Sequence, residues 1–302
     1  MGPDDALATA LRGDDVDEVA RCLEAGAAIN GVAGKLPPLV AAASAGATAC
    51  MTLLLARGAD PNGTGGFDRA PIHAVRDAAG LKVLQAAGAD LNLRCAGGQT
   101  ALHLAAANGE PPLIKALLGA GLDPNAAMEA WDQRPLQVAV RLRRSAAVKA
   151  LMQRPPAAAI VGLCVLELIP IPPHRPGGLP AKDEKTLQAL LAARPDLDAL
   201  VHNGMRIVHF LAERGTEALT AQVLAAGADP NGRTADDLTG VCYAAARAAA
   251  STGPERERCL GVVRAFAAAG ADLDVPCTRH PAPGFDGQTA RQILTALGVR
   301  LP

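Results

Sequence analysis

The sequence predicts an all-α solenoid of stacked helix–turn–helix units joined by hairpin-like turns, and three observations lead to this fold class. A short phrase such as GADPN recurs, with copies that begin at residues 26, 58, 88, 121, 227 and 270 and a weaker copy at 194. A second, apolar phrase such as TALHLAA precedes these endings by a nearly fixed distance. Finally, half of the residues are hydrophobic but only 2% are aromatic, which suits thin alanine- and leucine-rich helices that pack closely.

Each unit is expected to contain two helices, and the stretch around residues 100–121 illustrates why. The apolar phrase opens the first helix, and a glycine ends it at Gly46, Gly109 and Gly215. Pro111 and Pro112 suit the first turn of the second helix, where a missing N–H costs nothing. The apolar face of that helix is Leu113, Ile114, Leu117 and Leu118. Gly121 supplies a left-handed residue to end it.

Two helices and a turn in about 33 residues, with a T-P-L-H-x-A-like start, resemble the ankyrin repeat. The resemblance implies a single array over residues 1–302 and a protein-binding surface without catalysis. Units are expected to end near 26, 58, 88, 121, 154, 194, 227 and 270, followed by a cap over 289–302. The acidic first unit suits a polar end cap.

Thr100 and His103 are three residues apart and raise the question of a reactive hydroxyl and its base. The resemblance implies a structural pair instead, in which hydroxyl and imidazole bond each other and nearby backbone. His73 and His209 match the histidine position only. A catalytic pair would also need an orienting third group and a pocket.

Departures from the repeat are the places where specific function is expected. Five prolines and two glycines fall in 170–181, between helices expected at 161–169 and 182–193. This segment is either a tolerated surface loop or a contact element that carries His174 and Arg175. The eighth unit lengthens both of its helices, and the third unit is three residues short, which should distort the stacking locally.

Three of the six aromatic residues, Phe67, Trp131 and Phe285, fall in turns directly before an aspartate. In ankyrin proteins such turns project as fingers and often contact the partner, so these side chains either bind a partner or fold back onto the next unit. The candidate partner-binding residues are Phe67, Asp68, Arg69, Trp131, Asp132, Arg143, Arg144, His174, Arg175, Arg233 and Phe285.

The basic stretch at 141–154 places Arg143 and Arg144 at the end of a first helix, where Arg175, Lys182 and Lys185 are expected to share the edge. These charges form either a solvated helix edge or a site for an acidic protein.

Bulk properties narrow the function classes. A net charge of −1 argues against nucleic-acid binding, and no apolar run is long enough to span a membrane. The seven scattered cysteines indicate reduced thiols rather than a disulfide framework or zinc site. No cofactor is expected, and the N-terminus lacks the pattern of a secretory signal, which favours a cytoplasmic protein.

The function predicted is therefore non-catalytic protein binding. The alanine-rich composition suggests a bacterial protein, either an immunity protein that blocks a toxin or, alternatively, an adaptor or secreted effector. An enzyme is the remaining class, with Glu167 and His174 or Cys277 and His280 as candidate pairs, but neither pair has a recognisable third group.

Overall fold

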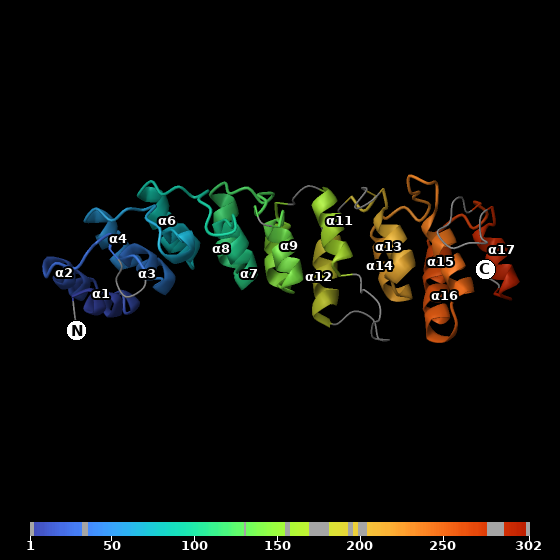
Figure 1. The fold of residues 1–302 in the computed structure, drawn as a ribbon, viewed down its shortest axis with the longest axis horizontal. Coiled ribbons are helices and arrows are strands. Elements are labelled where there is room, and N and C mark those ends of the chain that lie inside the picture. Colours follow the sequence, from blue (N-terminus) through green and yellow to red (C-terminus); the bar gives the residue numbers. More distant parts are fainter. Residues whose placement is uncertain are drawn as a thin grey trace. The chain divides into compact units, whose positions relative to one another are not determined.

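The structure is a computed structural model of the chain, and it divides into two compact units, Met1–Arg154 and Pro155–Pro302. The residues that it describes are 3–31, 36–129, 131–154, 158–168, 181–192, 196–198, 204–276 and 287–299. Within these ranges the regular elements are helices, and pairing of extended backbone is limited to isolated bridges (Figure 1). The predicted all-α class is confirmed. A single array over 1–302 stays a prediction.

The first unit consists of five helix pairs in chain order. Its helices are α1 (Pro3–Arg12), α2 (Val16–Glu24), α3 (Pro38–Ala45), α4 (Thr48–Ala56), α5 (Pro71–Ala74), α6 (Ala78–Ala86), α7 (Ala101–Asn108), α8 (Pro111–Gly119), α9 (Pro135–Arg141) and α10 (Ser145–Leu151). The first helix of each pair contacts the first helix of the next, and the second helices contact one another in the same way. Two parallel rows of helices result.

Small side chains hold these rows together. Ala42, Ala43, Ala105 and Ala106 in the first helices are buried, with at most 1% of their surface exposed. Leu113, Ile114, Leu117 and Leu118 of α8 are buried as the apolar periodicity predicts. The end of α7 is also where the sequence predicts it, since Gly109 ends this helix in the left-handed conformation at φ 75°.

Thr100 and His103 form a structural pair, which answers the question that the sequence raises. His103 Nδ1 accepts hydrogen bonds from the Thr100 amide at 3.2 Å and from its hydroxyl at 2.9 Å. The other ring nitrogen, Nε2, donates to the Gln133 carbonyl at 3.0 Å. His103 therefore joins the start of its own helix to the following turn, and both ring nitrogens are committed.

The same contact recurs at the matching positions. His73 accepts from the Ala70 amide and donates to the Leu93 carbonyl. His209 does the same with Arg206 and Leu238 in the second unit. Burial lowers the pKa of all three imidazoles, His73, His103 and His209, so the neutral form is favoured.

The recurring GADPN phrase builds a ladder of hydrogen bonds along the turns, here called the turn ladder. Within each turn the aspartate accepts from the amide two residues later, as Asp60 does from Asn62 at 2.9 Å. In four cases that second residue then accepts from the aspartate amide of the next turn, whereas no such bond joins the described residues Asn92 and Asp123. The rungs are Asn30 to Asp60 at 2.9 Å, Asn62 to Asp90 at 2.8 Å, Asp198 to Asp229 at 2.8 Å and Asn231 to Asp272 at 2.7 Å.

Helix α5 shows where the short third unit loses its residues. It has four residues, whereas α3 and α7 on either side have eight. The backbone leaves the helix at Val75, which is extended at φ −60° and ψ 140°. Asp77 then caps α6 by accepting from the Gly80 amide at 2.8 Å. The distortion expected from the sequence is thus a missing helical turn.

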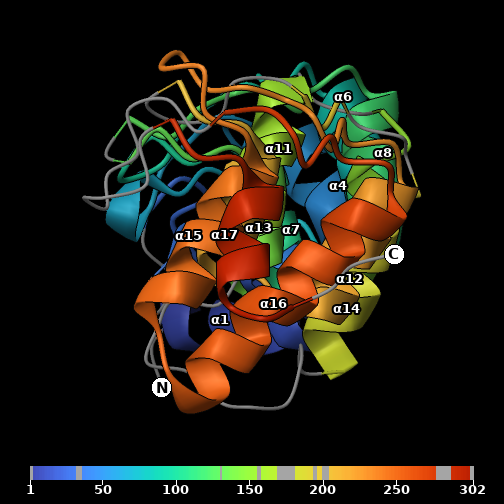
Figure 2. The same ribbon diagram turned by 90° about the vertical axis from the view of Figure 1, so that its right-hand side faces the viewer.

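In its described ranges, the second unit contains three helix pairs and one further helix. Its helices are α11 (Ala158–Leu166), α12 (Ala181–Leu191), α13 (Ile207–Arg214), α14 (Glu217–Ala225), α15 (Gly240–Ala250), α16 (Gly253–Ala268) and α17 (Ala290–Ala296). Helices α15 and α16 have 11 and 16 residues, as the lengthened eighth unit predicts. Figure 2 shows α15 beside both α16 and α17, in agreement with their contacts.

Arg258 connects the long helix α16 to the end of α13. Its guanidinium donates to the carbonyls of Gly215 at 2.6 Å and Glu213 at 3.0 Å. It also bonds both carboxylate oxygens of Glu255, at 3.0 and 2.8 Å. A charge-assisted donor thus satisfies carbonyls that a helix end leaves without an intrahelical partner.

The cysteines match the sequence expectation at five positions and contradict it at one. Cys22, Cys50, Cys95, Cys164 and Cys259 are buried free thiols. Cys242 is disulfide-bonded, and its partner lies outside the described residues. The expectation of reduced thiols is therefore wrong for Cys242. The predicted cytoplasmic location stays a prediction.

Candidate functional site

Three turns of the first unit form a connected row, here called the finger row, at residues 65–69, 94–99 and 127–133. The carbonyl of Phe67 in the first finger accepts from the Ala96 amide in the second at 3.0 Å. Arg94 extends from the second finger and donates to the Ala127 carbonyl in the third at 2.7 Å. The three fingers therefore hold one another in place.

Close backbone contact joins the second and third fingers at Gly98. Its φ is 75°, and a Cβ at this position would lie 2.6 Å from the Glu129 backbone nitrogen. Gly97 beside it has φ 79°, but a Cβ there would meet nothing within 4 Å. Both positions need a left-handed backbone, and only Gly98 also needs the absence of a side chain.

The two largest exposed side chains of the described residues belong to this row. Phe67 is 83% exposed and Trp131 is 64% exposed. The alternative that they fold back onto a neighbouring unit is therefore wrong for both. Phe67, Asp68 and Asp132 have φ of 62°, 54° and 49°. Left-handed backbone is costly for side chains other than glycine, so the fingers keep a strained shape.

Charged side chains accompany these aromatic residues. Asp132 accepts from Arg134 at 2.9 Å, and 81% of the Asp132 side chain is exposed. Asp68 and Arg69 beside Phe67 are exposed as well. The finger row thus presents two aromatic anchors with polar neighbours, a composition typical of protein interfaces.

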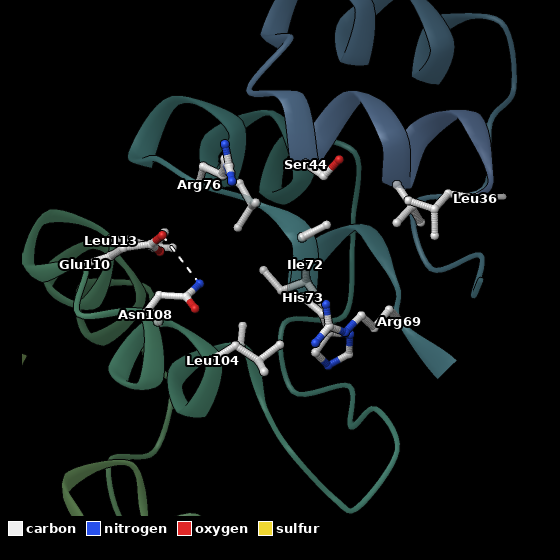
Figure 3. A pocket seen from close by; sticks show the side chains of 15 residues that line it. Leu36, Ser44, Arg69, Ile72, His73, Arg76, Leu104, Asn108, Glu110 and Leu113 are labelled. Atoms are coloured by element: carbon white, nitrogen blue, oxygen red, sulfur yellow. Dashed lines mark hydrogen bonds between the residues drawn. The ribbon is translucent and has the colours of Figure 1, made fainter. Parts of the chain in front are cut away.

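A hollow of about 190 Å³ lies over the short helix α5, between α3 and α7 (Figure 3). Val40 and Ser44 of α3 line one wall, and Leu104 and Asn108 of α7 line the other. Ile72 and Ala74 of α5 lie along the floor, while Arg69, Arg76 and Glu110 stand at the rim. Sequence reasoning predicted a distortion at this unit but not a hollow.

The predicted basic edge has a structural role at one of its members. The Arg144 Nε donates to the Ala107 carbonyl at 3.0 Å, near the end of α7. Arg143 beside it is half-buried and left-handed at φ 56°. Lys185 is exposed on α12 of the second unit, so a shared edge stays a prediction.

The remaining candidates fall in the second unit. Arg233 pairs with Asp237 at 2.6 Å, and 46% of its side chain is exposed. His174, Arg175 and Phe285 lie outside the described residues, as does most of the 170–181 insertion. Their contact roles therefore stay predictions.

The free thiols and the three histidines in the described residues are buried. Burial raises the pKa of all five free thiols, most strongly that of Cys164, and it raises the pKa of Cys50 to about 12. The other three are Cys22, Cys95 and Cys259. Glu167 is exposed, and its proposed partner His174 lies outside the described residues, as do Cys277 and His280. The described ranges bring together no group of three metal-ligating side chains.

None of the helices in the described ranges combines the length and apolarity needed to cross a membrane.

Comparison with known families decides what the repeated helix pairs are. Residues 72–160 match the family model of ankyrin repeats, in three copies. This stretch contains ankyrin repeats. It includes α6 to α10, all of α5 except Pro71, and the second and third fingers, whereas the α3 wall of the hollow lies before it. No curated protein matches the chain.

Proposed function

We propose that this chain is a non-catalytic ankyrin-repeat module that binds a specific protein partner through the finger row. Ankyrin repeats indicate a protein-interaction module. The observation that carries the proposal is the exposure of Phe67 and Trp131, at 83% and 64%, in two fingers connected through a third. Exposed aromatic side chains on a preorganised backbone favour binding because little conformational entropy is lost.

We extend the ankyrin-repeat assignment from residues 72–160 to the helix pairs on either side. The support is the turn ladder, in which the rung from Asn62 to Asp90 at the start of the matched stretch has counterparts of similar length outside it. Asn30 bonds Asp60 in the first unit, and Asn231 bonds Asp272 in the second. His209 likewise repeats the contacts of His103.

The test compares three forms of the full chain as baits in affinity capture from the native cell, read by quantitative mass spectrometry. Phe67→Ala with Trp131→Ala should reduce capture of the specific partner by ~30-fold or more, since truncating one hot-spot residue costs about 2 kcal/mol. Leu142→Ala is the matched control, because Leu142 is a large apolar residue, 46% exposed, outside the finger row.

The control should capture the partner as well as the wild type does. If the finger variant and the wild type captured the partner equally, the finger row would not be part of the binding surface. Because all three side chains are exposed, circular dichroism should give the same helix content for each bait.

Within this class we propose a toxin-blocking role in a bacterium. The support is compositional, namely many alanines and only 2% aromatic residues. Coexpression with the product of the neighbouring gene tests this role. Rescue from that product's toxicity by the wild type, and loss of rescue by the finger variant, are expected. Unchanged toxicity in the presence of the wild-type chain would reject the role for this gene pair.

A further inference from the structure

The hollow over α5 is a candidate subsite of the proposed binding surface, and the inference below rests on that proposed function. Helix α5 stops after four residues, so this repeat places no second helical turn between α3 and α7. The space left open measures about 190 Å³. The hollow is therefore a direct consequence of the three residues that the third unit lacks.

The lining suits an apolar group of limited size. Leu36, Ala74 and Leu104 line the hollow and are half-buried, so they supply its accessible apolar surface, while Val40 and Ile72 are 1% exposed and lie beneath it. An apolar cavity of about 150 Å³ accommodates a benzene-sized molecule. The hollow thus has room for one aliphatic or aromatic side chain against this apolar surface, and the polar side chains of Ser44 and Asn108 also line its walls.

The rim adds a charge preference. Arg69 and Arg76 lie on opposite sides of the hollow in Figure 3, and both are exposed. Neither has a carboxylate within ion-pair distance in the part of the chain that the structure describes. The acidic rim residue, Glu110, faces the amide of Asn108 at 3.5 Å. Because the rim carries two positive side chains and one negative side chain, a ligand with carboxylates should bind there more favourably than one with positive charges.

We propose that the hollow receives one apolar side chain from a partner segment that carries carboxylates on both sides of it. The first finger supports this placement, because Arg69 at the rim is two residues after the exposed Phe67. A segment that contacts Phe67 would continue directly into the hollow. Pairing of its carboxylates with Arg69 and Arg76 would fix the position of the segment along the hollow, and its apolar side chain would make the buried contact.

The test selects displayed random heptapeptides against the full wild-type chain and against Ala74→Leu. Ala74 lies in the floor of the hollow and is half-buried, so a leucine there fills the space. Peptides enriched on the wild type should contain one Leu, Ile, Met or Phe between acidic residues. The best peptide, synthesised with a fluorescent label, should bind Ala74→Leu at least ~10-fold more weakly in anisotropy titrations.

A charge reversal provides a second variant that leaves the cavity unchanged. Arg76→Glu should weaken the same peptide at least ~5-fold, because attraction becomes repulsion at the rim. Arg57→Glu is the control, since Arg57 is also exposed in the first unit but lies outside the hollow. It should change the affinity by less than ~2-fold.

Three results would overturn the inference. The wild type could enrich basic peptides, it could enrich no peptide relative to Ala74→Leu, or the best peptide could bind Ala74→Leu and the wild type equally well. The capture experiment separates this failure from failure of the proposed function. If the finger variant loses the partner while Ala74→Leu retains peptide binding, the finger row stands and the hollow does not. If neither variant changes binding, both proposals fail.

Discussion

Replacing His103 with alanine would remove a side chain that holds two segments of the first unit together. The Thr100 amide and the Gln133 carbonyl, at 3.2 and 3.0 Å from the imidazole, would both lose their partner. Thr100 is 6% exposed and Gln133 is half-buried. The amide has little access to water, whereas the carbonyl has some.

The expected cost follows from these two groups. Each buried polar group left unsatisfied costs about 1–3 kcal/mol, so the free energy of unfolding should fall by about 2–4 kcal/mol after allowing for partial hydration of the carbonyl. His103→Gln is the graded control. Gln137 occupies the same position in the next repeat and accepts from the Arg134 amide at 3.0 Å. Glutamine should therefore cost only about 1 kcal/mol.

Proton linkage gives a second signature of the same residue. Burial lowers the pKa of His103 below its ordinary value of 6.5. As the pH falls below 6.5, the unfolded chain takes up the proton first, so stability is complete above this pH and declines toward the folded-state pKa. One such histidine contributes a slope of at most about 1.4 kcal/mol per pH unit. His103→Gln should remove that contribution and leave those of His73 and His209.

The assay is urea unfolding of the full chain, followed by circular dichroism between pH 5 and pH 8. Equal destabilisation by alanine and glutamine would show that the amide contact contributes little. A variant profile as steep as that of the wild type would show that His103 does not titrate differently in the two states. Either result would refute the reasoning from burial and paired ring nitrogens.

Two further predictions concern the turns and use the same urea assay. Asn62→Ala should lower the free energy of unfolding by about 1 kcal/mol, because it removes a rung of the turn ladder. Asn62→Asp should keep a free energy of unfolding close to that of the wild type, because Asp198 makes the same contact at 2.8 Å. Equal losses for the two variants would contradict this account. Gly97→Ala should cost about 1–2 kcal/mol from its left-handed backbone, and Gly98→Ala should cost about 1–3 kcal/mol more, because its methyl group would meet the Glu129 backbone. Matching effects at the two glycines would mean that the second and third fingers do not pack as described.

Much of the fold could be predicted because its signals are local. The start of α8 at Pro111 and the end of α7 at Gly109 depend on backbone preferences that one residue type expresses strongly. The pairing of Thr100 with His103 spans three residues, and the family resemblance supplied its meaning. The position of Phe67 and Trp131 in turns left open whether they are exposed or fold back, and their exposure is a finding of the structure.

Other features depend on residues that are distant in sequence. The turn ladder was visible as a repeated phrase, but its bonds join residues 28 to 41 positions apart. The sequence assigns Arg144 either to a solvated edge or to a site for an acidic protein. It does not predict the contact with the Ala107 carbonyl, which is 37 positions away. The hollow needed three separate helices, and the sequence showed only that one of them was short.

The turn ladder also explains how the repeats can differ so much in length without losing register. Its rungs keep distances of 2.7 to 2.9 Å while the intervening chain varies from 28 to 41 residues. The short α5 and the long α16 both fall between intact rungs. Changes in length are therefore absorbed at the helices that lie between these rungs. A lineage could add or delete helical turns to reshape one binding feature, such as the hollow, while the neighbouring contacts stay in place.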